Sequence, residues 1–191
     1  MLRDADCAAL LRLLRIPTAG PLEAGPSEPE SRLWDAVDLY AEAAAGIGFD
    51  IVHRAAAAPS AALGEDVPLP VRRAATRPGF LAAQPSLVLR LGPARPRRRT
   101  VMCNVHLDTV DGFETAEFDG VRFRGRGAID AKGPAIALLA GIRAAAAAEP
   151  AIGTEVSVVI QAVSGEEGGV MGTLGTRPLV EQGHVGRLNL F

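Results

Sequence analysis

Three short motifs combine residue types that bind metal ions and move protons. One imidazole and several carboxylates form a mixed set of nitrogen and oxygen donors, which suits zinc and related divalent ions. Agreement in residue type, order and placement is unlikely to arise by chance, so the three motifs together predict a metal site. They are His106-Leu107-Asp108, the run Gly125 to Gly133 that contains Asp130, and Ser164-Gly165-Glu166-Glu167-Gly168-Gly169.

The first motif places a ligand and an orienting residue two positions apart. In an extended segment His106 and Asp108 point to the same side, so Asp108 can fix the imidazole for metal binding. For an isolated triplet of this kind, a histidine held by an ordinary hydrogen bond is the more frequent interpretation.

The second motif leads into a predicted helix. Asp130 is expected at the N-terminus of that helix, where the positive end of the helix dipole favours a carboxylate. The neighbouring glycines let the backbone turn sharply around it. For an isolated Gly-rich turn that ends in Asp, a plain N-cap is the preferred interpretation, and Lys132 has the equally plain alternative of a surface charge.

The third motif sets two carboxylates side by side. The flanking glycines allow a turn that brings Glu166 and Glu167 toward one cavity. One carboxylate would then bind a cation, while the other, unligated, takes a proton from water and passes it to a leaving nitrogen. A solvated acidic loop is the ordinary interpretation of an isolated Glu-Glu pair.

Alternating helices and strands are expected to position these motifs. Residues 55–85 are interrupted by five prolines and are predicted to be a variable connection. The order of helices and strands along the chain predicts an α/β fold with a mixed or parallel sheet flanked by helices. The ends of its strands are expected to carry the motifs. The predicted helices span 4–16, 27–45 (opened by a capping box at Ser27) and 131–148, and the strands span 49–54, 86–91, 100–105 and 155–163.

Composition narrows the range of partners. The chain has 191 residues, 48% of them hydrophobic, and 20 basic against 22 acidic residues. This balance argues against nucleic acid or an anionic membrane as a partner and favours a small neutral or zwitterionic molecule. Cys7 and Cys103 are expected to be free thiols of a cytoplasmic protein. The start shows no export signal. We expect the arginines of segment 95–99, His53 and His184 to lie at the surface.

The three motifs together resemble the signatures of the di-zinc aminoacylase, carboxypeptidase and desuccinylase family of metallopeptidases. The matching residues are His106-Leu-Asp108-Thr-Val110, Gly125-Arg-Gly127 through Asp130-Ala-Lys-Gly133, and Glu166-Glu167-Gly168. The resemblance implies two Zn²⁺ ions, with Co²⁺ as an alternative, and a cis peptide bond after Asp130. It implies that His106 binds one zinc, Asp130 bridges both, Glu167 binds the other, Glu166 is the general base and Asp108 orients His106.

The same resemblance sets expectations for the architecture. Residues 1–191 would form the N-terminal portion of a three-layer catalytic domain with a mixed, mostly parallel sheet, incomplete because the lid or dimerisation domain and the C-terminal catalytic portion are absent. Leu190-Phe191 would lie in the strand that delivers a further acidic ligand. The wording from Asp130 to Pro134 is similar to deacylases that release lysine or ornithine from N-acyl or carrier-linked forms.

For the complete enzyme these observations predict hydrolysis of an amide bond in an N-acyl amino acid or small peptide. We expect little or no turnover from the 191 residues alone, since a missing C-terminal part or a second chain must complete the site. The alternative is a non-catalytic binding or partner protein that retains the fold. A fragment of a full carboxypeptidase is a further alternative. The acyl group, the amino acid and the oligomeric state do not follow from the sequence.

Overall fold

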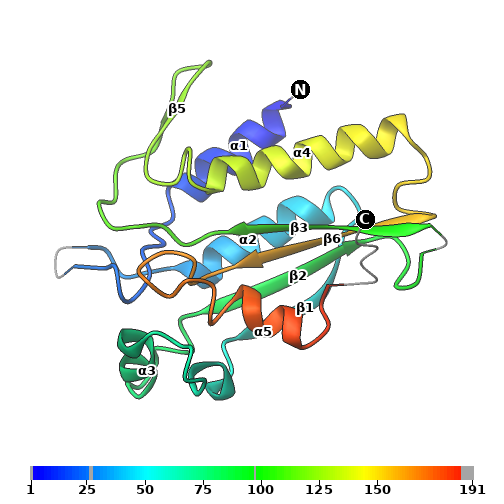
Figure 1. Ribbon diagram of the computed structural model, residues 1–191. Helices are drawn as coiled ribbons and strands as arrows, with labels where there is room; N and C mark the ends of the chain where they lie inside the picture. Colours follow the sequence, from blue (N-terminus) through cyan, green and yellow to red (C-terminus); the bar gives the residue numbers. More distant parts are fainter. Residues whose placement is uncertain (1, 26–27, 97, 186–191) are drawn as a thin grey trace.

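A computed structural model describes residues 2–25, 28–96 and 98–185 of the chain (Figure 1). Six strands alternate with five α-helices and one short 3-10 helix in these residues. The elements are α1 (Asp4–Leu14), α2 (Leu33–Ala45), β1 (Asp50–Ala56), η1 (Pro59–Ala62), α3 (Leu69–Ala75), β2 (Pro85–Leu91), β3 (Arg99–His106), β4 (Glu117–Phe118), β5 (Phe123–Arg124), α4 (Lys132–Ala148), β6 (Val156–Val163) and α5 (Thr176–Glu181).

Four strands form one sheet in the order β1-β2-β6-β3. The pairs β1–β2 and β2–β6 are antiparallel, and β3–β6 is parallel. The predicted mixed sheet flanked by helices is confirmed. Among the described strands it is not mostly parallel, because β6 lies between β2 and β3, which run in opposite directions. β6 must therefore oppose one neighbour and parallel the other.

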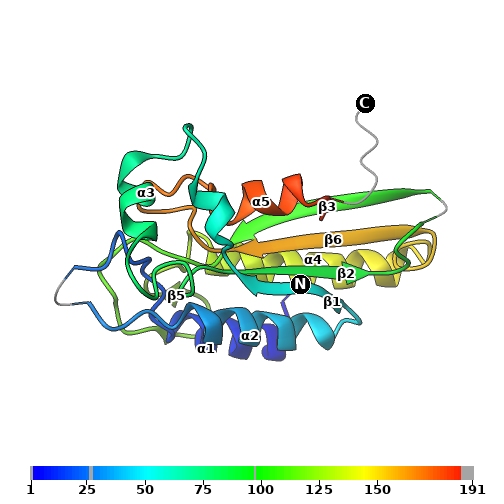
Figure 2. The same ribbon diagram turned by 90° about the horizontal axis from the view of Figure 1, so that it is seen from below.

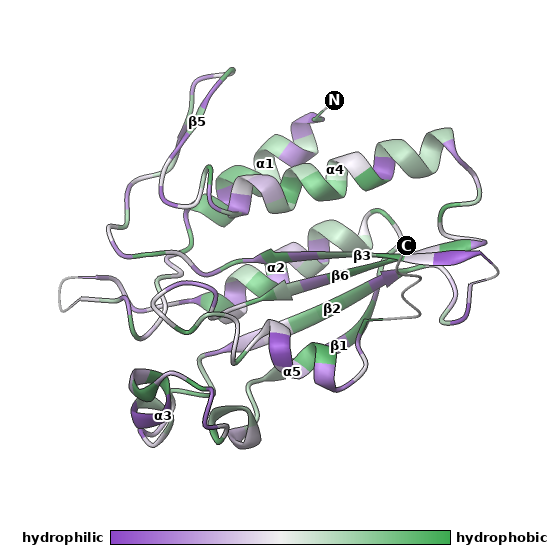
Figure 3. Cartoon of the chain, in the orientation of Figure 1, coloured by the Kyte–Doolittle hydropathy of each residue, from purple (hydrophilic) through white to green (hydrophobic). Residues whose placement is uncertain are grey.

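Helices cover the two faces of the sheet unequally. Figures 1 and 2 show α1, α2 and α4 on one face and the short α5 on the other, where it packs against β6. The main core lies between the sheet and the three longer helices, and its fully buried side chains include Tyr40, Leu87, Leu89 and Ile160. In Figure 3, β6 and much of α4 are coloured as hydrophobic, as expected for elements packed in a core. The result is a three-layer arrangement with one thin outer layer.

The helix boundaries agree with the sequence prediction except at α2. That helix begins at Leu33, and Pro29 and Glu30 precede it without helical structure; Ser27 lies outside the described residues. The backbone N–H of Arg32 donates to the Pro17 carbonyl at 2.8 Å, so this residue bonds to the segment after α1 and not to a preceding helical turn. A tertiary hydrogen bond therefore decides where this helix starts.

The connection between β1 and β2 contains more structure than its prolines suggest. It includes η1 and α3, whose side chains form a second apolar cluster. Val67, Val71 and Phe80 pack there with Val170 and Leu174. The predicted variable connection therefore supports the loop that follows β6 and carries the Glu pair.

Several expectations outside the motifs are also tested. Both cysteines are free thiols, and Arg95, Arg98 and Arg99 are exposed, with Arg98 2.7 Å from Glu155. Arg97 and the strand predicted at Leu190-Phe191 lie outside the described residues. No helix in the described part of the chain has both the length and the apolar character needed to cross a membrane.

Candidate metal centre

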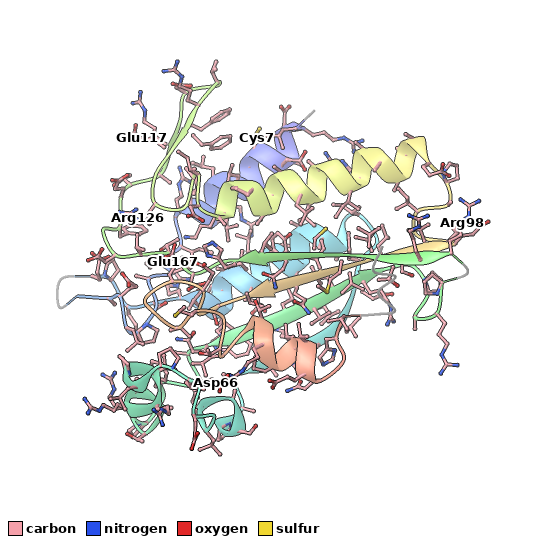
Figure 4. All side chains as sticks on the ribbon, viewed as in Figure 1. Cys7, Asp66, Arg98, Glu117, Arg126 and Glu167 are labelled. Carbon is pink, nitrogen blue, oxygen red and sulfur yellow. The ribbon has the colours of Figure 1, made fainter. Side chains whose placement is uncertain are left out.

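Three potential ligands from three separate segments meet at one end of the sheet. His106 is the last residue of β3, Asp130 lies two residues before α4, and Glu167 follows β6. One nitrogen or carboxylate oxygen from each of these side chains lies within 4.8 Å of the other two. Figure 4 shows Glu167 and Arg126 at this end of the sheet and Arg98 at the opposite end. The parallel pairing of β3 and β6 makes this convergence possible, because both strands end at the same edge.

His106 makes the shortest contact of the group. Its Nε2 atom lies 2.9 Å from Asp130 Oδ1 and 3.9 Å from Glu166 Oε2. The His106 side chain is 13% exposed, whereas that of Asp130 is 73% exposed. The ligand group is therefore anchored on its imidazole side and open to solvent on its carboxylate side.

Asp108 lies beneath the group and is 1% exposed. Its Oδ2 atom accepts hydrogen bonds from the backbone N–H groups of Glu166 and Glu167, each at 3.0 Å. Its Oδ1 atom has no hydrogen-bond partner among the described residues and lies 3.6 Å from His106 Nδ1, which is itself 3.0 Å from the Asp108 carbonyl oxygen. A single buried carboxylate thus contacts the first motif and the third.

The charges of the group shift the pKa values of two members. Burial lowers the pKa of His106, but the Asp108 carboxylate and Asp130 raise it more, to about 9. Burial and the neighbouring Glu166 raise the pKa of Glu167, partly opposed by His106. Crowded carboxylates of this kind disfavour their own ionised forms, and a cation bound between them would relieve that repulsion.

Glycines shape the loop that carries the Glu pair. Gly165 and Gly168 have φ values of 75° and 66°, in the left-handed region that side chains disfavour. The Gly172 N–H donates to the Gly165 carbonyl at 2.8 Å and closes the loop. The sharp turn predicted from the flanking glycines is therefore present.

The turn before α4 contains the expected cis peptide bond, between Asp130 and Ala131. Lys132, for which a surface charge was the plain alternative, is 1% exposed. Its ammonium group donates to the Ile16 carbonyl at 2.7 Å, and burial lowers the pKa of Lys132 to about 7. The surface alternative is therefore excluded, and spacing along the chain gave no sign that the segment just after α1 covers this turn.

The segment that follows α1 supports the site, although its residue types gave no signal for such a role. The Thr109 N–H donates to the Thr18 carbonyl at 3.1 Å. The carboxylate of Glu28 accepts hydrogen bonds from the backbone N–H groups of Gly112 and Phe113 at 2.9 and 3.2 Å. These hydrogen bonds hold the chain after His106 in place. No local sequence pattern predicts them, because they join residues far apart in the sequence.

The other two histidines form a pair outside the ligand group. His53 on β1 and His184 after α5 are half-buried, with ring centroids 4.6 Å apart. Burial and the neighbouring His184 lower the pKa of His53. Both histidines keep part of their surface exposed, in line with the predicted surface position, and the chain after α5 brings His184 against His53 on β1.

The residues present fit a divalent cation. His106, Asp130 and Glu167 supply one nitrogen and two carboxylate oxygens, a donor set typical of zinc. The unpartnered Oδ1 of buried Asp108 beside His106 Nδ1 fits the outer partner that a metal-binding imidazole usually has. The chain therefore combines an α/β fold with a group of side chains that could bind a metal ion.

The family comparison agrees with this combination of fold and side chains. Residues 102–190 match the model of Peptidase family M20/M25/M40, and this segment contains all three motifs. The resemblance to this family of metallopeptidases, predicted from the motifs, is confirmed.

One curated relative and several solved structures are similar to the chain. A protein of Aeropyrum pernix assigned as a LysW-lysine/LysW-ornithine hydrolase is 41% identical over 63 residues, which are 33% of this chain and 17% of that protein. An M20 family metallo-carboxypeptidase from Sulfolobus solfataricus aligns with a TM-score of 0.60 at 15% identity, covering 94% of this chain and 34% of that one.

Two further structures align with lower scores. An aminopeptidase from Bacillus cereus has a TM-score of 0.52 at 13% identity and covers 87% of this chain and 38% of its own. A tripeptidase from Staphylococcus aureus has a TM-score of 0.50 at 15% identity and covers 91% and 40%. At such identities the alignments establish the fold, and the chain spans well under half the length of these proteins.

Proposed function

We propose that this chain forms the N-terminal, metal-binding portion of a zinc-dependent amidohydrolase or exopeptidase. The observation that carries the proposal is the convergence of His106, Asp130 and Glu167 within 4.8 Å at the end of two parallel strands. The family match over all three motifs supports it.

In this proposal each residue has a separate role. His106, Asp130 and Glu167 would hold zinc, which when bound supplies a Lewis acid that polarises the scissile carbonyl. Glu166 is the general base: its carboxylate lies 3.9 Å from His106 Nε2, outside the ligand group, and its side chain is 56% exposed. It would accept a proton from water and pass it to the leaving nitrogen. Asp108 contacts both His106 and the loop of the Glu pair, and so fixes their positions relative to each other.

The proposed substrate is an N-acyl amino acid, a carrier-linked amino acid or a small peptide. The exposed side of the group, at Asp130, leaves room for such a molecule. The assigned activity of the Aeropyrum pernix relative, on LysW-linked lysine or ornithine, supports the carrier-linked class. The sequence from Asp130 to Pro134 also favours a carrier-linked substrate.

We further propose that the 191 residues alone turn over slowly or not at all and bind metal only at partial occupancy. Three ligands converge among the described residues, whereas a two-ion site needs more. Further sequence of the same protein, or a second chain, would supply the remaining ligands. A cytoplasmic location fits this role.

Zinc titration of the purified chain by isothermal calorimetry tests the proposal with an adjacent pair of variants. Glu167→Gln removes a ligand and should abolish measurable binding. Glu166→Gln makes the same chemical change one residue away and should leave zinc affinity nearly unchanged, because it removes a base and no ligand. Equal loss in both variants would contradict the assigned roles. A wild-type chain that binds no zinc would favour a non-catalytic protein that retains the fold.

A further inference from the structure

Lys132 is the only lysine in the chain. The sequence contains 20 lysine and arginine residues, so every other cationic side chain of this kind is an arginine. Among the lysine and arginine residues that the structure describes, this lysine is also the most buried, with an exposed fraction of 1%. In a chain that otherwise uses arginine, a lysine at this position needs an explanation. The surroundings of the side chain give a physical reason for lysine in place of arginine.

The space around Lys132 suits a narrow side chain. A Cβ atom added to Gly127 would lie 2.8 Å from Lys132 Cδ and 3.1 Å from Cγ, so the lysine stem lies directly against the Gly127 backbone. Its ammonium group reaches the Ile16 carbonyl at 2.7 Å. The planar guanidinium of an arginine is wider and carries five N–H donors. It would not fit between the Gly127 backbone and the Ile16 carbonyl without rearrangement.

The position is an unfavourable one for a cation. Lys132 is the first residue of α4, where the helix dipole presents its positive end. Among the described residues no carboxylate forms an ion pair with it, and its one hydrogen-bond acceptor is the carbonyl at the end of α1. Burial of a charge with so few partners costs free energy, so a contribution to stability does not by itself explain the residue.

Lys132 holds in place the turn that carries Asp130. Lys132 follows this ligand by two residues, and its hydrogen bond ties the turn to Ile16. Two residues further along that segment, the Thr18 carbonyl accepts from the Thr109 N–H at 3.1 Å, which ties the same segment to the loop after His106. The loops of two ligands are therefore both attached to residues 16–18.

We propose that Lys132 is a positioning residue of the metal site. By fastening the Asp130 turn to the Ile16 carbonyl, it keeps Asp130 Oδ1 within reach of His106 Nε2, 2.9 Å away. This inference rests on the metal site proposed above and assigns the lysine no contact with metal or substrate.

Lys132→Met tests the role, because methionine keeps most of the stem and removes the N–H donors. Arg143→Met is the matched control. Arg143 lies on the same helix α4 and also joins it to α1, through two hydrogen bonds of 2.6 Å to Asp6. Lys132→Met should weaken zinc binding by about 10- to 100-fold, the usual effect of losing an outer partner of a metal ligand. Arg143→Met should lower the melting temperature without changing zinc affinity.

A second measurement on the metal-free protein separates the two proposals. The ¹⁵N shifts of the His106 imidazole report its contact with Asp130, and they should change in Lys132→Met and not in Arg143→Met. Unchanged His106 shifts and zinc affinity in Lys132→Met would overturn the positioning role and leave the metal site intact. Similar changes in both variants would also overturn it, since they would reflect only loosened packing of α1 on α4.

Two complications are covered by the same design. If the wild-type chain binds no zinc, the proposed metal site fails, and the His106 shifts still decide whether Lys132 positions Asp130. If Lys132→Met does not fold, Lys132→Gln replaces it, because the glutamine amide retains N–H donors on a shorter stem. That variant should keep the fold and give an intermediate loss of zinc affinity, and wild-type affinity in it would contradict the proposal.

Discussion

His106 and His53 are both partly buried histidines, but they lie in two regions and contact different side chains. His106 faces the carboxylates of Asp108 and Asp130, which raise its pKa to about 9. His53 faces the ring of His184, and its pKa is lowered by burial and by that neighbour. Burial alone therefore does not mark a metal-binding histidine. Convergent carboxylates do, because they supply both further ligands and an outer partner for the imidazole.

The largest expected effect comes from exchanging each histidine for glutamine. His106→Gln should reduce zinc affinity by more than the about 10- to 100-fold typical of an outer partner, because a ligand itself is lost. His53→Gln, the matched variant in the other region, should leave zinc affinity unchanged. Calorimetric titration of both measures the difference, with circular dichroism to verify that each is folded. A comparable loss in His53→Gln would remove the distinction between the two regions.

A smaller effect is expected when the carboxylate beneath His106 is neutralised. Asp108→Asn should lower zinc affinity by about 10- to 100-fold, since an amide cannot both accept from the Glu166 and Glu167 backbone and support the imidazole with a negative charge. Asp119→Asn is its control.

Asp119 also accepts two backbone hydrogen bonds, from Val121 and Arg122 at 2.9 and 2.8 Å, but on an exposed hairpin away from the ligand group. Equal zinc affinity for wild type and Asp108→Asn would show that the carboxylate serves only the loop and not the ligand. A loss of affinity in Asp119→Asn would instead indicate a general effect of removing a carboxylate.

The smallest effect concerns the pH dependence of stability in the His53 region. Because the folded-state pKa of His53 is lowered, the unfolded chain binds more protons below its ordinary value of 6.5. The resulting stability is present above pH 6.5 and lost as pH falls through the lowered value. His53 is only half-buried, so the loss should be a fraction of the about 1.4 kcal/mol that one pKa unit represents.

Denaturant unfolding of wild type and His53→Gln from pH 7 to pH 5 measures this loss. The variant should lose less stability than wild type across that range. A steeper loss in His53→Gln would mean that His53 is stabilised in its charged form, as His106 is.

Much of the fold follows from local patterns. The strand ending at His106, the helix after Asp130 and the apolar strand before Glu166 each appear within two residues of their predicted bounds. Period-two and helical patterns report which face of an element is buried, and that information is local. The start of α2 was missed because a hydrogen bond from Arg32 to Pro17, rather than a local cap, sets it.

The sequence by itself determined which residue types stand at the strand ends, and so the chemistry available at the site. Only the tertiary structure decided that β6 lies between β2 and β3, that Lys132 is buried under the end of α1, and that His53 meets His184. The reason is physical: residue type and periodicity depend on near neighbours along the chain. Strand order, buried polar contacts and pKa shifts depend on segments that are distant in sequence and meet only when the core forms.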